Sequence, residues 1–196
     1  MRHAIITRET KETSVQVTLD IEGEGQPIID SGLGFFDHML DLFARHGHFD
    51  LKVRCKGDYD VDGHHSIEDV GIALGRAFDH ALGDRRGIKR YGSLLLPMDE
   101  ALVMLALDIS GRPHLSYDVE FLTERAGEFE VQLAEEFFNG FARTLKATLH
   151  IKKIAGSNTH HILEALFKGF GLALGEAVAI DPKYKNVIPS SKGTLV

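Results

Sequence analysis

Strands are marked in this chain by apolar residues that alternate with other residues. Apolar side chains occupy every second position over residues 15–21, and the same spacing recurs over residues 103–109 and 115–121. A period of two puts these side chains on one face of an extended segment. Each segment is therefore predicted to be a strand with one buried face.

Four other segments have the apolar spacing of helices. Residues three or four positions apart are apolar over 36–43, 67–81, 133–145 and 163–178. On a helix with 3.6 residues per turn such residues form one stripe, and the usual role of that stripe is core packing. Strands and helices in this order predict an α+β fold in which helices cover the sheets.

The pattern occurs twice because the sequence contains a repeat. Residues 4–23 align with residues 92–111 without a gap, and in this alignment Glu12 falls on Glu100. Self-similarity over such a length indicates a duplicated structural unit.

A second stretch of the repeat lies later in each half. Residues 64–82 align with residues 160–178, and both copies begin with two histidines followed by a glutamate three places on. We therefore predict two half-domains, 1–88 and 89–196, with an insertion near 122–130 in the second half.

This histidine motif is the strongest chemical signal in the chain. Positions three or four apart share a helix face, whereas adjacent histidines point about 100° apart. We expect each histidine of a pair to bind a different metal ion, with carboxylates and the other copy completing the ligands. The two copies, each at the start of a predicted helix, read His64-His65-x-x-Glu68 and His160-His161-x-x-Glu164.

One more candidate ligand precedes each motif. His38 lies 13 positions before Leu51, and Glu136 lies 13 positions before Leu149, so the repeat equates His38 with Glu136. Imidazole and carboxylate ligands without a thiolate leave Mn²⁺, Fe²⁺, Zn²⁺, Co²⁺ and Ni²⁺ open. The residues alone therefore predict a divalent-metal site without deciding the metal.

Composition and charge narrow the class of protein. The 196 residues carry a net charge of −7 with scattered lysines and arginines, so no nucleic-acid partner is expected. No apolar run has the length of a membrane span, and the first residues lack the apolar stretch of a signal peptide. Cys55 is the single cysteine, which fits a reducing compartment, and we expect a cytoplasmic protein.

Longer motifs resemble the imidazole-glycerol-phosphate dehydratase family, and the likeness spans nearly the whole chain in order. They are Phe35-Phe36-Asp37-His38-Met39-Leu40, Asp62-Gly63-His64-His65-x-x-Glu68-Asp69, Asn158-x-His160-His161-x-x-Glu164-Ala165-x-Phe167-Lys168 and Pro189-Ser190-x-Lys192-Gly193. The resemblance implies a duplicated fold similar to ribosomal protein S5 domain 2, with a helical bundle packed between two mixed β-sheets. It also implies a homo-oligomer of twenty-four subunits with sites at subunit junctions.

The same resemblance implies two Mn²⁺ ions in each site. Many members of the family carry histidine where this chain has Glu136, and a carboxylate is also a ligand for Mn²⁺. The matched ligand positions are His38, His64, His65, Glu68, Glu136, His160, His161 and Glu164.

The implied reaction removes water from imidazole-glycerol phosphate and leaves imidazole-acetol phosphate, a step of histidine biosynthesis. Metals on both ring nitrogens would let the ring ionise to imidazolate and expel hydroxide, while a carboxylate base acts on the side chain. The resemblance assigns catalysis to Glu12 as that base, with His65 and Glu164. Substrate contacts are expected from Glu12, His38, His46, His64, His65, Glu68, Arg90, Arg112, Glu136, His160, His161, Lys168, Ser190, Ser191 and Lys192.

Two other functions fit the same residues. A dinuclear metallohydrolase would use such ligands equally well, and product analysis distinguishes it because dehydration gives a ketone without hydrolytic cleavage. A metal-bridged assembly or storage protein would bind the metals and turn over no substrate. The candidate arginines and lysines favour an anionic ligand over that last function.

Overall fold

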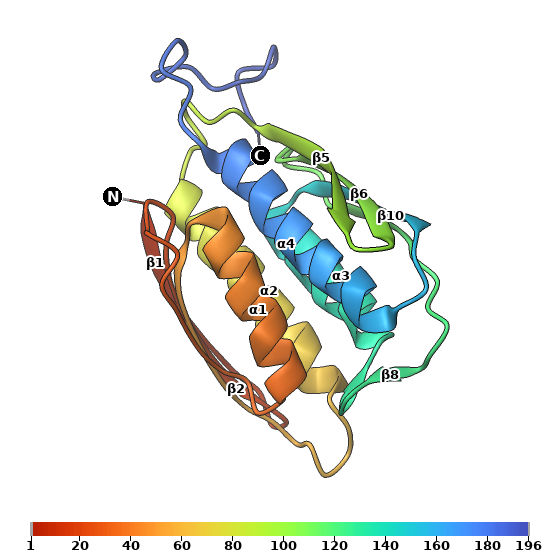
Figure 1. Cartoon of the computed structure of the whole chain (residues 1–196). Helices are drawn as coiled ribbons and strands as arrows, with labels where there is room; N and C mark the ends of the chain where they lie inside the picture. The colour runs from red at the N-terminus through yellow and green to blue at the C-terminus, as the bar shows by residue number, and fades with distance from the viewer. Residues whose placement is uncertain (1, 196) are drawn as a thin grey trace.

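Four helices lie between two β-sheets in the computed structural model of the chain, which describes residues 2–195 (Figure 1). Each of these sheets has four strands, and each is mixed because one strand pair runs parallel. Alternating burial turns the apolar side chains of the central strands toward the core. The predicted α+β fold, with helices packed between two mixed sheets, is confirmed. No helix within residues 2–195 is long and apolar enough to span a membrane.

The first sheet contains the strands of the first half of the chain in the order β1-β2-β4-β3. β1, β2 and β4 are antiparallel neighbours, and β3 runs parallel to β4. α2 packs on β1 and β2, whereas α1 packs on β3. The bounds are β1 His3–Glu9, β2 Ser14–Asp20, β3 Pro27–Asp30, α1 Gly34–Gly47, β4 Asp50–Lys56 and α2 His64–Leu82.

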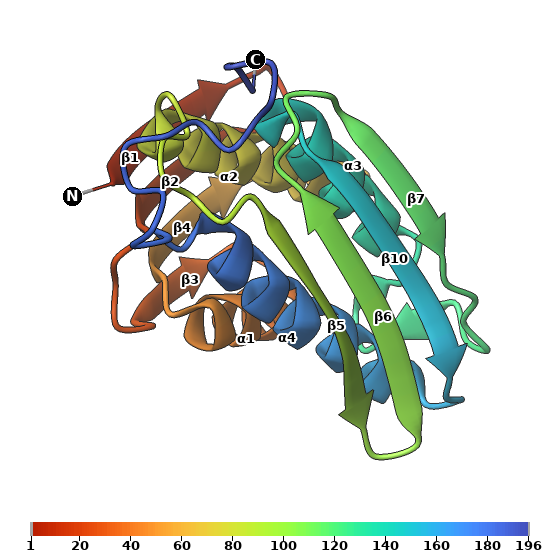
Figure 2. The same ribbon diagram turned by 90° about the horizontal axis from the view of Figure 1, so that it is seen from above.

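The second sheet repeats this plan in the order β5-β6-β10-β7, and α3 and α4 pack on the face that lies behind it in Figure 2. The strand predicted over 115–121 ends at Asp118, although Val119 and Phe121 still pack against the core. A short hairpin of β8 and β9 lies within the predicted insertion. The bounds are β5 Tyr91–Met98, β6 Ala101–Asp108, β7 His114–Asp118, β8 Arg125–Ala126, β9 Phe129–Glu130, α3 Leu133–Leu145, β10 Thr148–Ala155 and α4 Thr159–Val178.

The helices pair across the two halves, α1 with α4 and α2 with α3. Gly171 lets α4 approach α1 closely, because a Cβ there would lie 2.4 Å from the Phe43 carbonyl oxygen. Gly75 of α2, the matching residue of the repeat, lets α2 approach α3 in the same way, because a Cβ there would lie 2.5 Å from the Phe141 carbonyl oxygen. Both halves therefore share one core, and the division of the chain at residue 88 stays a prediction.

The final segment, residues 181–195, folds back on the junction between the halves. Three arginines of this junction each donate a hydrogen bond to one of its carbonyl groups. Arg85, which is fully buried, also donates to Asp79 at 2.6 Å. The tail is thus held at the end of the molecule where α4 finishes. The three bonds run from Arg85 to Leu195 at 2.7 Å, from Arg86 to Asn186 at 2.7 Å and from Arg90 to Pro189 at 2.9 Å.

Candidate metal centre

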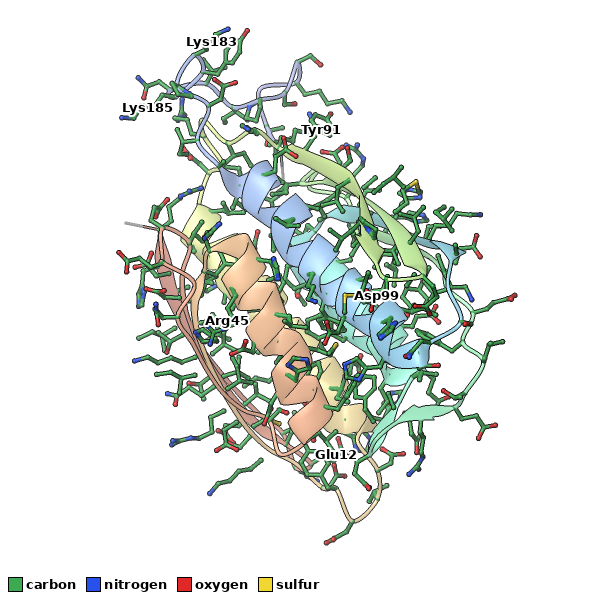
Figure 3. All side chains as sticks on the ribbon, in the orientation of Figure 1. Glu12, Arg45, Tyr91, Asp99, Lys183 and Lys185 are labelled. Atoms are coloured by element: carbon green, nitrogen blue, oxygen red, sulfur yellow. The ribbon has the colours of Figure 1, made fainter. Side chains whose placement is uncertain are left out.

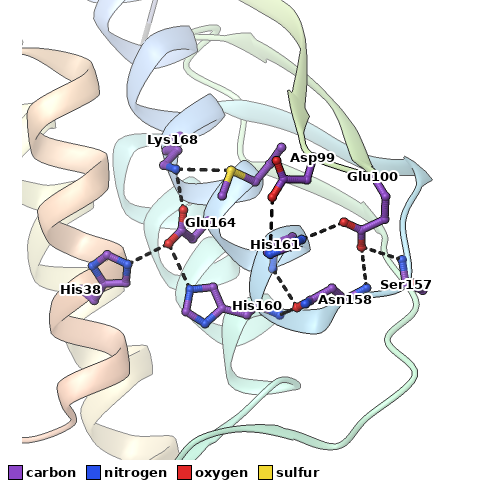
Figure 4. Close-up of polar contacts among 10 residues, drawn as sticks. His38, Asp99, Glu100, Ser157, Asn158, His160, His161, Glu164 and Lys168 are labelled. Carbon is purple, nitrogen blue, oxygen red and sulfur yellow. Dashed lines mark hydrogen bonds and ion pairs between the residues drawn. The ribbon is translucent and has the colours of Figure 1, made fainter.

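Three predicted ligands meet where α1 and α4 lie side by side. His38 is on α1, and His160 and Glu164 are one turn apart on α4 (Figure 4). The Nε2 atoms of His38 and His160 lie 2.9 and 3.0 Å from the same atom, Glu164 Oε1. One ligand atom from each of the three side chains lies within 4.8 Å of the others. Two imidazoles and a carboxylate at this spacing form a donor set that fits a divalent cation.

Glu164 is ionised in this setting. Burial raises the pKa of its carboxyl group, but hydrogen bonds from Lys168, His38 and His160 outweigh burial and bring the pKa to about 2. The shortest of these bonds joins Lys168 Nζ to Glu164 Oε2 at 2.5 Å. The carboxylate therefore offers a full negative charge to a cation, with Lys168 as its counter-ion in the metal-free protein.

Asn158 sets the start of α4 and so the direction of its histidines. Its side-chain oxygen accepts hydrogen bonds from the backbone N–H groups of His160 and His161, at 2.9 and 3.2 Å. Asparagine is a favoured residue here because it satisfies donors that have no partner inside the helix. The helical turn then puts His160 and Glu164 on one face and directs His161 elsewhere.

His161 faces acids of the β5–β6 turn (Figure 4). Its Nδ1 atom lies 2.7 Å from Glu100 Oε2, and its Nε2 atom lies 3.7 Å from Asp99 Oδ2. The hydrogen bond with Glu100 raises the pKa of His161, and the same bond is the main cause that lowers the pKa of Glu100 to about 2. The adjacent histidines of α4 therefore contact different groups of side chains.

The first copy of the motif does not gather its ligands in the same way. The counterparts of the α4 residues are His64 and Glu68 on α2, and the counterpart of His38 is Glu136 on α3. Arg143 of α3 donates to Glu68 Oε1 at 3.1 Å. Within residues 2–195 the structure contains one group of three close ligand atoms, and it is not this one. The assignment of His64, Glu68 and Glu136 as ligands stays a prediction.

Glu12, the predicted base, lies in the turn between β1 and β2, at the end of the molecule opposite Lys183 and Lys185 (Figure 3). Among residues 2–195 its exposed carboxylate has no hydrogen bond or ion pair. A hydrogen bond with Asp58, at 2.9 Å, raises the pKa of His65, and the charge of Glu12 adds to that shift. The Glu12 carboxylate is thus unengaged and within electrostatic reach of His65.

Two of the predicted substrate contacts lie near the three meeting ligands. Lys168 is bonded to Glu164, one turn farther along α4. Burial lowers the pKa of His46, on α1, and the charge of Lys168 lowers it further. The contact between α1 and α4 therefore brings together a carboxylate, a cation and several imidazoles.

The other predicted phosphate contacts lie at the end of the molecule where α4 finishes. Arg90 donates to Asp108 at 2.7 and 3.0 Å and holds Pro189, beside residues 190–192. Arg112 is exposed in the loop after β6. It lies near Arg90, because the last residue of β6 pairs with the first residue of β5, which directly follows Arg90. His160 lies in the first turn of α4, and this group of phosphate contacts lies beyond the last residue of the helix. From Glu164 to the last residue of α4, Val178, the helix rises about 20 Å, so the tail does not meet the metal centre of its own chain.

Comparison with known proteins decides the family. The model of the imidazoleglycerol-phosphate dehydratase family matches residues 31–174. The chain is also 54% identical over 195 residues to an imidazoleglycerol-phosphate dehydratase of Caldicellulosiruptor saccharolyticus, covering 99% of this chain and 98% of that protein. The chain belongs to the imidazoleglycerol-phosphate dehydratase family. It is accordingly an enzyme of the hydro-lyase class, and the resemblance found in the sequence motifs is confirmed.

Solved structures of this family have the same fold. The crystal structure of imidazoleglycerol-phosphate dehydratase from Staphylococcus aureus matches with a TM-score of 0.80 at 36% identity, over 91% of this chain and 99% of that one. The Pyrococcus furiosus protein, crystallised in complex with (S)-C348, matches with a TM-score of 0.80 at 39% identity, over 97% of this chain and 100% of that one. The duplicated architecture is therefore that of the dehydratase family.

Sequence reasoning gave no role to three side chains that contact or adjoin the first histidine motif. Asp58 forms a hydrogen bond with His65, and Arg143 donates one to Glu68. No spacing rule links either residue to the motif that it contacts. Asp69 is buried directly after the first motif. A closer comparison of the repeats would have found it, because the matching residue of the second half is Ala165.

Proposed function

We propose that the chain dehydrates imidazole-glycerol phosphate to imidazole-acetol phosphate in histidine biosynthesis, with two Mn²⁺ ions in each site. The observation that carries the proposal is the meeting of His38, His160 and Glu164 around one carboxylate oxygen. Nitrogen and oxygen ligands without a thiolate suit Mn²⁺. The names of the relatives support the substrate. We expect the activity in the cytoplasm, with which the free, buried Cys55 is consistent.

The candidate ligands of this chain form two groups: three that lie close together in the structure, and five that do not. His38, His160 and Glu164 would hold one divalent ion, which when bound acts as a Lewis acid toward the azole ring of the substrate. The remaining candidates would complete the two ligand sets, and Glu68 would have to leave Arg143 to do so. Those remaining candidates are His64, His65, Glu68, Glu136 and His161.

Glu12 is our candidate for the general base. The hydrogen that leaves the substrate is on a carbon without an adjacent carbonyl group, so a base has to be placed close to it. A carboxylate that already accepts hydrogen bonds, as Glu100 does, has a lowered pKa and is a weaker base. Glu12 accepts none within the described chain. It therefore suits proton abstraction better than its counterpart, with His65 and Glu164 completing the catalytic set.

The phosphate group would be bound by more than one subunit. Lys168 lies in the metal centre, whereas Arg90, Arg112 and residues 190–192 lie beyond the end of α4, which is about 15 Å from Lys168 and about 20 Å from Glu164 along the helix. A single site that uses all of these residues therefore needs a second copy of the chain. This separation supports an assembly of twenty-four subunits with sites at their junctions, since closed symmetric assemblies repeat the same contact at every interface.

Removal and return of the metal test this proposal. Metal-free protein is incubated with imidazole-glycerol phosphate before and after reloading with Mn²⁺, and both the ketone product and inorganic phosphate are measured. We expect ketone only after reloading and no inorganic phosphate. His38→Ala should lose this activity, while His3→Ala, a change on the exposed side of β1, should keep it. Phosphate release would indicate a hydrolase instead, and metal binding without any product would indicate a storage or assembly role.

A further inference from the structure

A buried carboxylate fastens the turn that carries Glu12 to the helix that carries the first histidine motif. Asp69 of α2 is 5% exposed. Its Oδ1 atom accepts a hydrogen bond from Nε of Arg8, on β1, at 2.8 Å, and Nη2 of Arg8 forms an ion pair with the same oxygen at 2.8 Å. Its Oδ2 atom accepts a hydrogen bond from Thr13 Oγ1 at 2.5 Å. One side chain of α2 is therefore bonded to both sides of the β1–β2 connection.

The turn is closed by hydrogen bonds between Thr10 and Thr13. The Thr10 N–H group donates to the Thr13 carbonyl oxygen at 2.9 Å. The N–H groups of Glu12 and Thr13 donate to Thr10 Oγ1 at 3.1 and 2.9 Å. The two hydroxyl oxygens lie 3.1 Å apart. A continuous series of hydrogen bonds thus runs from the backbone of Glu12 through Thr10 and Thr13 to Asp69.

The second half of the chain has apolar residues at the three positions that match Arg8, Thr13 and Asp69. Strand pairing supports the alignment, because Arg8 pairs with Val15 and Leu96 pairs with Val103, the counterpart of Val15. Taking a carboxylate and a guanidinium out of water is costly, and apolar residues can often replace such a pair without loss of stability. Packing alone therefore does not require the polar group. The residues that match Arg8, Thr13 and Asp69 are Leu96, Ala101 and Ala165.

The two halves also hold the glutamate of this turn differently. Glu100 is fixed by its own side chain, which accepts hydrogen bonds from the N–H groups of Ser157 and Asn158 and is bonded to His161. Glu12 has no such contact, because Asp58 occupies the corresponding nitrogen of His65. The position of an unbonded side chain depends on its backbone. In the first half, where the Glu12 side chain is unbonded, the buried carboxylate of Asp69 holds the turn instead.

We propose that Asp69 is a positioning residue that holds the β1–β2 turn through Thr13 and thereby keeps Glu12 in place for turnover. Arg8 is its ion-pair partner, which offsets part of the cost of burying the carboxylate. This inference rests on the proposed dehydration, in which Glu12 is the base. It adds a residue that touches neither the substrate nor the metal. A displacement of the turn of about 1 Å is enough to cost a large factor in rate.

Four variants of the whole protein test this positioning role. Thr13→Val removes the hydroxyl and keeps a β-branched side chain in the strand, and Asp69→Asn keeps the size of the buried group. A triple variant, Arg8→Leu, Thr13→Ala and Asp69→Ala, installs the apolar residues of the second half and guards against loss of folding through a half-broken pair. Ser14→Ala is the matched control, because the neighbouring hydroxyl bonds Glu9 on the exposed side of the turn. Each variant is measured for kcat, KM, bound metal and thermal unfolding beside Glu12→Gln.

We expect kcat to fall by about 10- to 100-fold in Thr13→Val, Asp69→Asn and the triple variant, with KM and metal content near those of the wild type. Ser14→Ala should match the wild type. Wild-type kcat in these three variants, with Glu12→Gln inactive, would overturn the positioning role and leave the proposed function intact. Loss of metal in step with kcat would overturn it too, because Asp69 would then act through the neighbouring Glu68. Full turnover by Glu12→Gln would remove Glu12 from the mechanism, and this inference with it.

Discussion

His38 and Glu164 are 126 positions apart in the sequence, and His38 Nε2 lies 2.9 Å from Glu164 Oε1. The contact exists because α1 of the first half packs against α4 of the second. Gly171 permits that close approach, since a Cβ at this position would meet the backbone of α1. The metal centre is therefore formed by the packing between the halves, and neither half contains it alone.

Replacement of Glu164 by glutamine tests the role of this carboxylate. Glu164→Gln keeps the size of the side chain and removes the charge that its low pKa maintains. We expect the affinity for Mn²⁺ to fall by about 100-fold or more and turnover to fall with it. Glu176→Gln, an exposed change on the same helix, is the control. Calorimetric titration of metal into both proteins measures the difference, and equal affinities would exclude Glu164 as a ligand.

The same carboxylate gives the metal-free protein a defined acid sensitivity. The pKa of Glu164 falls from 4.5 to about 2 on folding, so the unfolded chain binds a proton here at pH values where the folded chain does not. This contribution to the free energy of unfolding is complete above the unfolded pKa and is lost as the pH falls through the folded pKa. Urea unfolding at about pH 6 and about pH 3 should show a larger loss for the wild type than for Glu164→Gln. Equal losses would contradict the lowered pKa.

Much of the fold could be predicted because each element follows a simple period. The stripes at 36–43 and 163–178 identify helices, and the repeat identifies the two sheets as copies of one plan. The crosswise pairing of the helices could not be predicted, because it depends on shape contacts such as Gly171 against Phe43. His38 could therefore be named as a ligand from the sequence, although the motif that it meets could not. The hydrogen bond between Arg143 and Glu68 could not be predicted for the same reason, because it joins helices from different halves of the chain.

Added methyl groups at the helix crossings should destabilise the protein. In Gly75→Ala and Gly171→Ala the new Cβ would lie 2.5 and 2.4 Å from a carbonyl oxygen of the neighbouring helix, so the helices must separate. We expect the free energy of unfolding to fall by about 1–3 kcal/mol in each variant. Gly34→Ala is the control, because nothing lies within 4 Å of the added group. Chemical denaturation that found all three variants alike would contradict close packing at these crossings.

Mixed assemblies test whether one site uses two chains. Glu164→Gln removes the metal centre and Lys192→Ala removes a predicted phosphate contact at the opposite end of the chain. Each variant alone should be inactive. When equal amounts are dissociated and reassembled together, about a quarter of the sites should combine an intact metal centre with an intact tail, if the two come from different subunits. The control is the same mixture without dissociation, and no recovery after reassembly would contradict a shared site.

The location of the metal in the active protein is the most direct test of this account. Anomalous diffraction at the manganese edge, from crystals of Mn²⁺-reloaded protein that turns over substrate, should show an ion bound by His38, His160 and Glu164. The ligand distances should be about 2.0–2.2 Å, as for divalent ions with imidazole and carboxylate ligands. An active protein without metal, or an ion bound away from these three side chains, would contradict the account.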